Sequence, residues 1–160
     1  MKRIIAAVLA AVMLCMLCAC GASEKDFSKA GMTITLTNKF VEKDLVSQTA
    51  YYESTDAIVT ALREGFDLFQ QAGIDTNITN KQYAELCITA NGLSSTAVDG
   101  NDKYAHFSYE KQVNGQDFSY EAYCFRTDDA FWLIQFACHT KNLSKMSSVF
   151  EKYANSVKFE

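Results

Sequence analysis

The segment from Lys103 to His139 constrains the fold more than any other part of the sequence. It contains three apolar and aromatic runs separated by two short polar turns. The first turn is Asn114-Gly115, and both residues tolerate the positive φ angles of a type I′ hairpin. We interpret Asp128-Asp129 as a second two-residue turn. The segment therefore predicts a meander of three long antiparallel strands with a defined register.

This register pairs Cys124 with Ala105 on one neighbouring strand and with Leu133 on the other, and it divides the side chains between two faces. The first face carries Ala105, Phe107, Tyr109, Phe118, Tyr120, Ala122, Cys124, Phe131, Leu133 and Ala137. The second face carries Tyr104, His106, Tyr123, Phe125, Trp132, Ile134, Phe136 and Cys138. Both faces are apolar, whereas a sheet with one wet face alternates apolar and polar residues. The sequence therefore predicts the α+β class, as a three-layer α/β/α sandwich around a central antiparallel sheet.

Three amphipathic segments can supply the covering helices. Their expected ranges are Ser54–Ala72, Thr79–Gly92 and Leu143–Asn155. Thr79 and Gln82 have the spacing of a capping box, and Gly73 stands where a C′ glycine would end the first helix. Further strands are expected at Gly31–Thr37, Ser47–Glu53 and Val157–Phe159.

Four packing motifs of this chain together suggest a resemblance to a known group of proteins. They are Gly31-Met32-Thr33-Ile34, the hairpin at Asn114-Gly115, the run Phe131–Ala137 and the closing Ser156-Val157-Lys158-Phe159. Together they resemble the PsbP-like fold, over roughly residues 31–160. That group includes extrinsic subunits of the oxygen-evolving photosystem, a nuclear-import regulator and small bacterial lipoproteins. The resemblance implies a non-enzymatic binding or assembly module, and it supplies no shared site residues.

The amino terminus predicts a secretory signal. Met1-Lys2-Arg3 is a short basic head, and the residues from Ile4 to Leu17 are almost all apolar. The sequence Leu17-Cys18-Ala19-Cys20 resembles the lipobox of bacterial lipoproteins. This resemblance implies cleavage before Cys20 and lipid attachment to its thiol. An uncleaved membrane anchor and ordinary cleavage after Ala22 remain as alternatives.

The lipoprotein interpretation divides the chain into three parts. Residues 1–19 are a signal peptide, residues 20–30 are the lipidated Cys20 with a polar tether, and residues 31–160 are a PsbP-like globular domain. The short tether would keep the domain close to the extracytoplasmic face of the cell membrane. The formal net charge of −4 argues against nucleic acid as a partner.

No cluster of residues in the sequence demands a particular chemistry. The register separates Cys124 and Cys138 onto opposite faces, which forbids a disulfide between them, whereas Cys87 could still meet either one. Buried free thiols are the expected state, and no C-x-x-C spacing is present. His106 has no accompanying nucleophile motif and is expected to be structural. We therefore assign no catalytic, metal-binding or cofactor-binding residue and expect no enzymatic activity.

The sequence favours a membrane-anchored lipoprotein that acts as a non-enzymatic protein-binding or assembly module in the cell envelope. The alternative is a lipoprotein that binds a small ligand or a metal in a groove beside the sheet, with Tyr51, Tyr52 and Tyr104 among the lining residues. The acidic segments Asp99–Asp102 and Asp128-Asp129 suit turn geometry, and they lack the spacing of a calcium-binding loop.

Overall fold

A computed structural model describes residues 22–160 of the chain. The predicted signal peptide and Cys20 lie outside these residues. The strands are β1 (Glu24–Lys29), β2 (Met32–Thr37), β3 (Val41–Glu42), β4 (Ala50–Glu53), β5 (Ile58–Gly65), β6 (Val98–Asp99), β7 (Tyr104–Val113), β8 (Gln116–Arg126), β9 (Ala130–His139) and β10 (Lys158–Phe159). The helices are α2 (Phe66–Gln71), α3 (Asn80–Ala90), the 3₁₀ turn η1 (Thr140–Asn142) and α4 (Leu143–Ser156). Within this part of the chain, no helix combines the length and apolar character needed to cross a bilayer.

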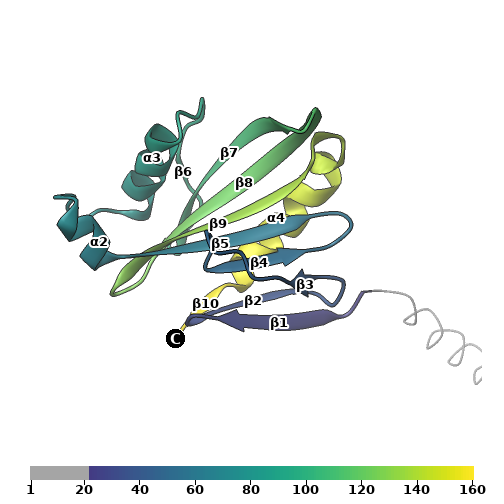
Figure 1. Cartoon of the computed structure of the whole chain (residues 1–160), viewed down its shortest axis with the longest axis horizontal. Helices are drawn as coiled ribbons and strands as arrows, with labels where there is room; N and C mark the ends of the chain where they lie inside the picture. Colours follow the sequence, from purple (N-terminus) through teal and green to yellow (C-terminus); the bar gives the residue numbers. More distant parts are fainter. Residues whose placement is uncertain (1–21) are drawn as a thin grey trace, which may run out of the picture.

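The strands form two antiparallel sheets (Figure 1). The larger has seven strands in the order β3-β4-β5-β9-β8-β7-β6, and the smaller has three in the order β1-β2-β10. The predicted hairpin register is confirmed, because Cys124 pairs with Ala105 on β7 and with Leu133 on β9. Asn114 and Gly115 have φ angles of 51° and 77°, as a type I′ turn requires.

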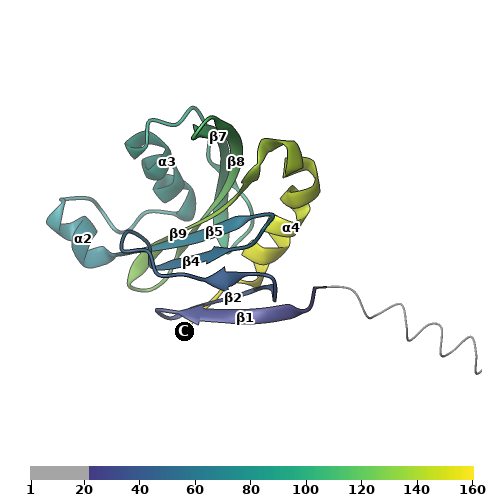
Figure 2. The same cartoon turned by 45° about the vertical axis from the view of Figure 1, so that its right-hand side comes forward.

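Both faces of the seven-stranded sheet are covered, as the sequence predicts. On one face α3 packs on β7 and β8, and the short α2 joins the same apolar cluster. On the other face α4 packs on β8 and β9 and also contacts β2 of the small sheet (Figure 2). The predicted α+β fold with a central antiparallel sheet between two covering layers is confirmed. One covering layer combines α4 with the small sheet.

The expected helix over Ser54–Ala72 is wrong for most of its length. Ile58–Gly65 is strand β5, and only Phe66–Gln71 is helical. β5 pairs with β4 on one side and β9 on the other, so it lies inside the large sheet. An internal strand buries side chains on both faces, and its apolar residues then lack the period of two that marks a half-buried strand. Gly73 follows the helix with a φ of 70°, which confirms its predicted role as a C′ residue.

The polar tether expected over residues 20–30 is also wrong for Glu24–Lys29. These residues form β1, which pairs with β2 from Glu24 opposite Thr37 to Lys29 opposite Met32. Phe27 anchors the strand by packing against Tyr52, with ring centroids 5.0 Å apart. One apolar residue in a polar segment produces no periodic signal. The folded unit therefore includes Glu24.

The other predicted elements are present with small changes in their limits. α3 begins with the predicted capping box, in which Thr79 accepts a hydrogen bond from the backbone of Gln82 and the Gln82 side chain bonds back to Thr79. α4 buries Phe150 and Tyr153 against the sheet. β2, β4 and β10 lie within the ranges expected for short strands.

Candidate functional site

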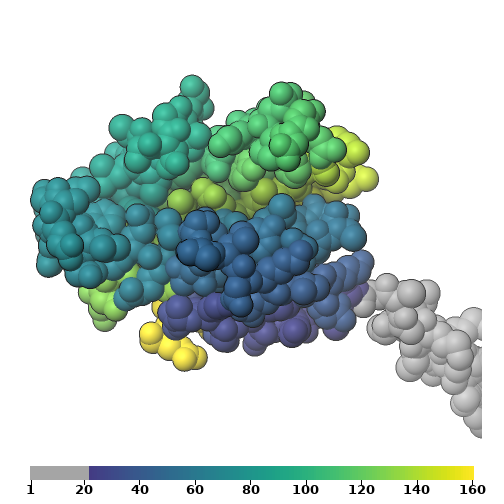
Figure 3. All heavy atoms as spheres, viewed as in Figure 1, coloured from purple at the N-terminus to yellow at the C-terminus, as the bar shows by residue number. Residues whose placement is uncertain are grey.

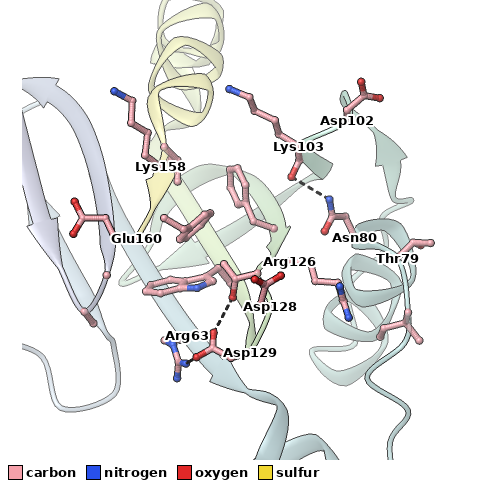
Figure 4. Close-up of a pocket in the computed structure, with 18 of the residues that line it drawn as sticks. Arg63, Thr79, Asn80, Asp102, Lys103, Arg126, Asp128, Asp129, Lys158 and Glu160 are labelled. Atoms are coloured by element: carbon pink, nitrogen blue, oxygen red, sulfur yellow. Dashed lines mark hydrogen bonds and ion pairs between the residues drawn. The ribbon is translucent and has the colours of Figure 1, made fainter.

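A pocket of about 1140 Å³ opens at one end of the large sheet (Figure 4). Turns and loops from well-separated parts of the chain form its walls. The lining residues are Ala30, Gly31, Arg63, Asn77, Ile78, Thr79, Asn80, Asp102, Lys103, Phe125, Arg126, Thr127, Asp128, Asp129, Trp132, Val157, Lys158, Phe159 and Glu160. Surface loops held by a rigid sheet are the usual position for recognition residues.

The β1–β2 turn fixes the carboxyl-terminal residues in one wall of this pocket. Ala30 and Gly31 have φ angles of 53° and 85°, which close the turn tightly. The backbone N–H of Glu160 donates to the carbonyl oxygen of Gly31 over 2.9 Å, and Lys158 pairs with Thr33 on β2. The sequence predicts a strand at β10, and among the described strands β10 pairs with β2 alone, so it is an edge strand of the small sheet.

Aromatic side chains of the core form the floor of the pocket. Trp132 is 2% exposed and Phe125 is 3% exposed, so only a small part of each side chain is accessible from the pocket. Phe159 of β10 packs on both rings, with centroid distances of 5.2 Å to Trp132 and 5.5 Å to Phe125. These contacts hold β10 against the large sheet and give the site an apolar base.

The rim of the pocket carries charges of both signs (Figure 4). Arg63 and Asp129 form a salt bridge on the rim, with 2.6 Å between Nη2 of Arg63 and Oδ2 of Asp129. Arg126 lies over the Phe66 ring, with its guanidinium carbon 5.1 Å from the centroid. Lys103 and Lys158 make no salt bridge with any residue in the range 22–160, and both ammonium groups extend from the rim in Figure 4. The site therefore offers free charged groups above an apolar floor.

Neither histidine lies at the pocket. His106 is bonded through Nε2 to the carboxylate of the buried Glu121, and its ring packs 4.9 Å from that of Tyr123. This agrees with the structural role expected for His106. His139 stacks on Phe118 at 4.5 Å. Among the described residues, no three His, Cys, Asp or Glu side chains are grouped so that they could hold a metal ion.

The tyrosines proposed for a groove are mostly core residues. Tyr52 is 0% exposed and Tyr104 is 3% exposed, and neither lines the pocket. Tyr51 is partly buried, and its hydroxyl donates to Glu53. The predicted turn at Asp99–Asp102 is confirmed, because the Asn101 side-chain oxygen accepts from the backbone N–H of Lys103 at 2.8 Å.

Sequence reasoning missed the residues that line the pocket, including Arg126, Trp132 and Lys158. Arg126 and Trp132 flank the β8–β9 turn and Lys158 lies in the last strand, and these positions give no local signal that they converge. The convergence depends on β10 pairing with β2, a contact between distant parts of the chain. The predicted lipid site, Cys20, lies outside the part of the chain that the structure describes.

No family model and no curated protein matches this chain. Several solved structures do match it. Cyanobacterial PsbP (CyanoP) from Synechocystis sp. PCC 6803 has a TM-score of 0.50 and 11% identity, over 89% of this chain and 96% of that one. The Saccharomyces cerevisiae Ran-binding protein Mog1p has a TM-score of 0.52 and 10% identity, over 87% and 96%.

LpqN of Mycobacterium tuberculosis, which is involved in cell envelope biogenesis, has a TM-score of 0.50 and 7% identity, over 85% of this chain and 90% of that one. Identities this low are informative about the fold alone. The order of strands, the two covered faces of the sheet and these three similarities lead to one conclusion: the chain has a PsbP-like α+β fold.

Proposed function

We propose that this chain is a non-enzymatic protein-binding module, held at the extracytoplasmic face of the cell membrane by a lipid on Cys20. The observation that carries the proposal is the open pocket, with its aromatic floor and its charged rim. Among the described residues, no histidine or cysteine lines this pocket, so a Ser–His or Cys–His pair is not available there. The named similarities support the same role, because Mog1p is a Ran-binding protein and LpqN acts in cell envelope biogenesis.

The shape and chemistry of the pocket suit a segment of a partner protein. Small-molecule sites usually enclose about 300–1000 Å³ with few polar groups. This pocket is larger, at about 1140 Å³, and charged side chains of both signs stand around it. Apolar contacts at the centre of an interface with a polar rim are typical of protein recognition. β10, an edge strand in the wall, also offers main-chain groups to an extended segment.

The position of β1 supports an orientation with the pocket away from the membrane. Only Gly21, Ala22 and Ser23 separate Cys20 from β1, so this link spans at most about 14 Å. β1 then runs about 20 Å from Glu24 to the turn at Ala30, which lines the pocket. In Figure 3 the carboxyl-terminal residues and the β8–β9 turn protrude together at the lower left, at the end of the molecule opposite the start of β1. A lipid on Cys20 would therefore present the pocket to partners in the envelope.

Site-specific photocrosslinking in intact cells of the native host tests this proposal. A photoreactive amino acid replaces Lys158 at the pocket, and a matched variant carries it at Lys111, an exposed position near the far end of β7. We expect one discrete crosslinked protein from position 158 in the membrane fraction, and none from position 111. Identical adducts from both positions, or no adduct from 158 and from a second pocket position at Lys103, would contradict the proposal.

The alternative is that the same pocket binds a small ligand. The aromatic floor formed by Trp132, Phe125 and Phe159 favours this alternative, because ring faces and edges commonly line ligand sites. Native mass spectrometry of protein isolated directly from membranes distinguishes the two. A stable extra mass that is lost in a Trp132→Ala variant would support binding of a small ligand. A mass equal to that of the lipidated chain alone would contradict this alternative.

A further inference from the structure

Two buried cysteines lie where α3 packs on the large sheet. Cys87 lies on the buried side of α3 and is 7% exposed, and Cys124 lies in β8 and is 0% exposed. Both belong to the same apolar cluster, in which α3 packs on β8. Cys138 lies in the separate cluster on the opposite face of the sheet. The three thiols are free in this structure.

Small side chains around this pair allow the helix to approach the sheet closely. Ala84 on α3 is fully buried, one turn before Cys87. Ala105 is the cross-strand partner of Cys124, and Ala122 lies two residues before it on the same face. A disulfide requires Cα atoms within about 7 Å of each other, and larger residues at these positions would hold the two backbones apart.

We propose that Cys87 and Cys124 form a disulfide bond that links α3 covalently to the central strand of the meander in the exported protein. Both thiols lie in the same packed cluster, on two contacting elements that are distant in sequence. Bond formation rests on export, which is part of the proposed function, because disulfides persist in extracytoplasmic compartments. Within residues 22–160, Cys138 has no partner cysteine on its own face of the sheet, and it stays a free thiol.

The exchange reaction needs an external disulfide, of the form R–S–S–R. The thiolate of one cysteine attacks it, forms a mixed disulfide and releases R–S⁻. The second cysteine gives up its proton and attacks the protein sulfur of the mixed disulfide, which releases the second R–S⁻. The protein loses two hydrogen atoms, and R–S–S–R is reduced to two R–SH.

Both side chains are buried in the folded protein, so the exchange takes place before α3 is fully packed on β7 and β8. At that stage the external disulfide can reach either thiol, and the other cysteine then resolves the mixed disulfide.

Peptide mapping of the full-length protein isolated from membranes tests the bond directly. The protein is alkylated in denaturant without reductant, digested and analysed by mass spectrometry. We expect the alkyl label on Cys138 and a linked peptide pair containing Cys87 and Cys124. A label on Cys20 would contradict lipidation without bearing on the disulfide, so the two proposals fail separately. Labels on Cys87 and Cys124, together with labels on the same residues after refolding in oxidised glutathione, would overturn the disulfide.

Thermal unfolding of three serine variants provides a second test. Reductant should lower the unfolding temperature of the wild type and of Cys138→Ser, because the cross-link limits the unfolded chain. Cys87→Ser should already unfold at the lower temperature and should not respond to reductant. Equal responses of Cys87→Ser and Cys138→Ser would contradict the proposal. Cys124→Ser should behave like Cys87→Ser. If this variant does not fold, peptide mapping of the wild type still shows whether the Cys87–Cys124 bond is present.

Discussion

The hydroxyl group of Tyr52 is buried and has no hydrogen-bond partner among residues 22–160. A buried unpaired hydroxyl lowers stability, because it has lost its bonds to water. We expect Tyr52→Phe to raise the free energy of unfolding by about 1 kcal/mol, measured by urea denaturation at pH 7. The ring contact with Phe27 is retained in this variant.

The ionisation of Tyr52 adds a pH dependence to the same prediction. Burial raises the pKa of Tyr52 from 10.0 to about 12 in the folded protein. Tyr52 ionises first in the unfolded state, so its ionisation does not affect the free energy of unfolding below pH 10. That free energy then falls as the pH rises from 10 through about 12. Tyr52→Phe should lessen the alkaline loss of stability in this interval.

Tyr83 is the matched control for Tyr52, because its hydroxyl is paired. It donates to a carboxylate oxygen of Glu64, and its ring stacks on Phe131 at 4.5 Å. Tyr83→Phe keeps the stacking and removes the bond, and should lower stability by about 1.5–3 kcal/mol. Equal losses in Tyr52→Phe and Tyr83→Phe would show that the Tyr52 hydroxyl has a partner after all.

Residue-level prediction from the sequence succeeded where the register alone decides the environment. It separated Cys124 from Cys138 and placed His106 in a packed position. The sequence did not show that Tyr52 and Tyr104 belong to the core and do not line a groove. Both lie in strands, where buried and exposed aromatic residues follow the same alternating pattern. Exposure in such a case depends on what covers the sheet, and β1, whose Phe27 covers Tyr52, had no sequence signal.

The contribution of the α3 capping box to the free energy of unfolding can be measured, with α4 of the same chain as the comparison. The Thr79 hydroxyl accepts from the Gln82 backbone over 3.2 Å. Thr79→Ala should lower the free energy of unfolding by about 1 kcal/mol, because a backbone donor at the helix start loses its partner. Urea denaturation followed by circular dichroism provides the measurement.

Asn142 is the control, because it stands at the cap of α4 and its side chain makes no capping hydrogen bond within the described chain. Asn142→Ala should change stability by less than about 0.5 kcal/mol. A loss as large as that of Thr79→Ala would mean that the cap residue contributes through something other than its side-chain bond.

The contrast between α3 and β5 explains which elements the sequence could predict. α3 carries its own start signal and a single buried stripe, so local residues suffice. β5 has apolar residues at helical spacings, yet Val59 and Ala61 are both 0% exposed between two neighbouring strands. Pairing on both sides stabilises the extended form of this segment, and that pairing involves β9, which is distant in sequence.

At the scale of the whole molecule, the pairing of the small sheet is the part that no local pattern predicts, although two of its strands, β2 and β10, were expected. It joins β1 and β2 to β10 at the other end of the chain. This junction closes one face of the large sheet and also builds a wall of the pocket. Fold class and meander register follow from local residues, whereas the pocket depends on contacts between the two ends of the folded unit.

The same junction makes the orientation on a membrane testable. The N–H of Asn38 donates to the Ser23 carbonyl over 2.8 Å, so Asn38 lies at the end where β1 begins, whereas Asp128 lines the pocket. A fluorescent amino acid is placed at either position in lipidated protein on vesicles that contain a headgroup-labelled acceptor. Energy transfer should be stronger from position 38, because β1 separates the two ends by about 20 Å. Equal transfer, or stronger transfer from position 128, would contradict the orientation, whereas protein that does not stay on the vesicles would contradict the anchor.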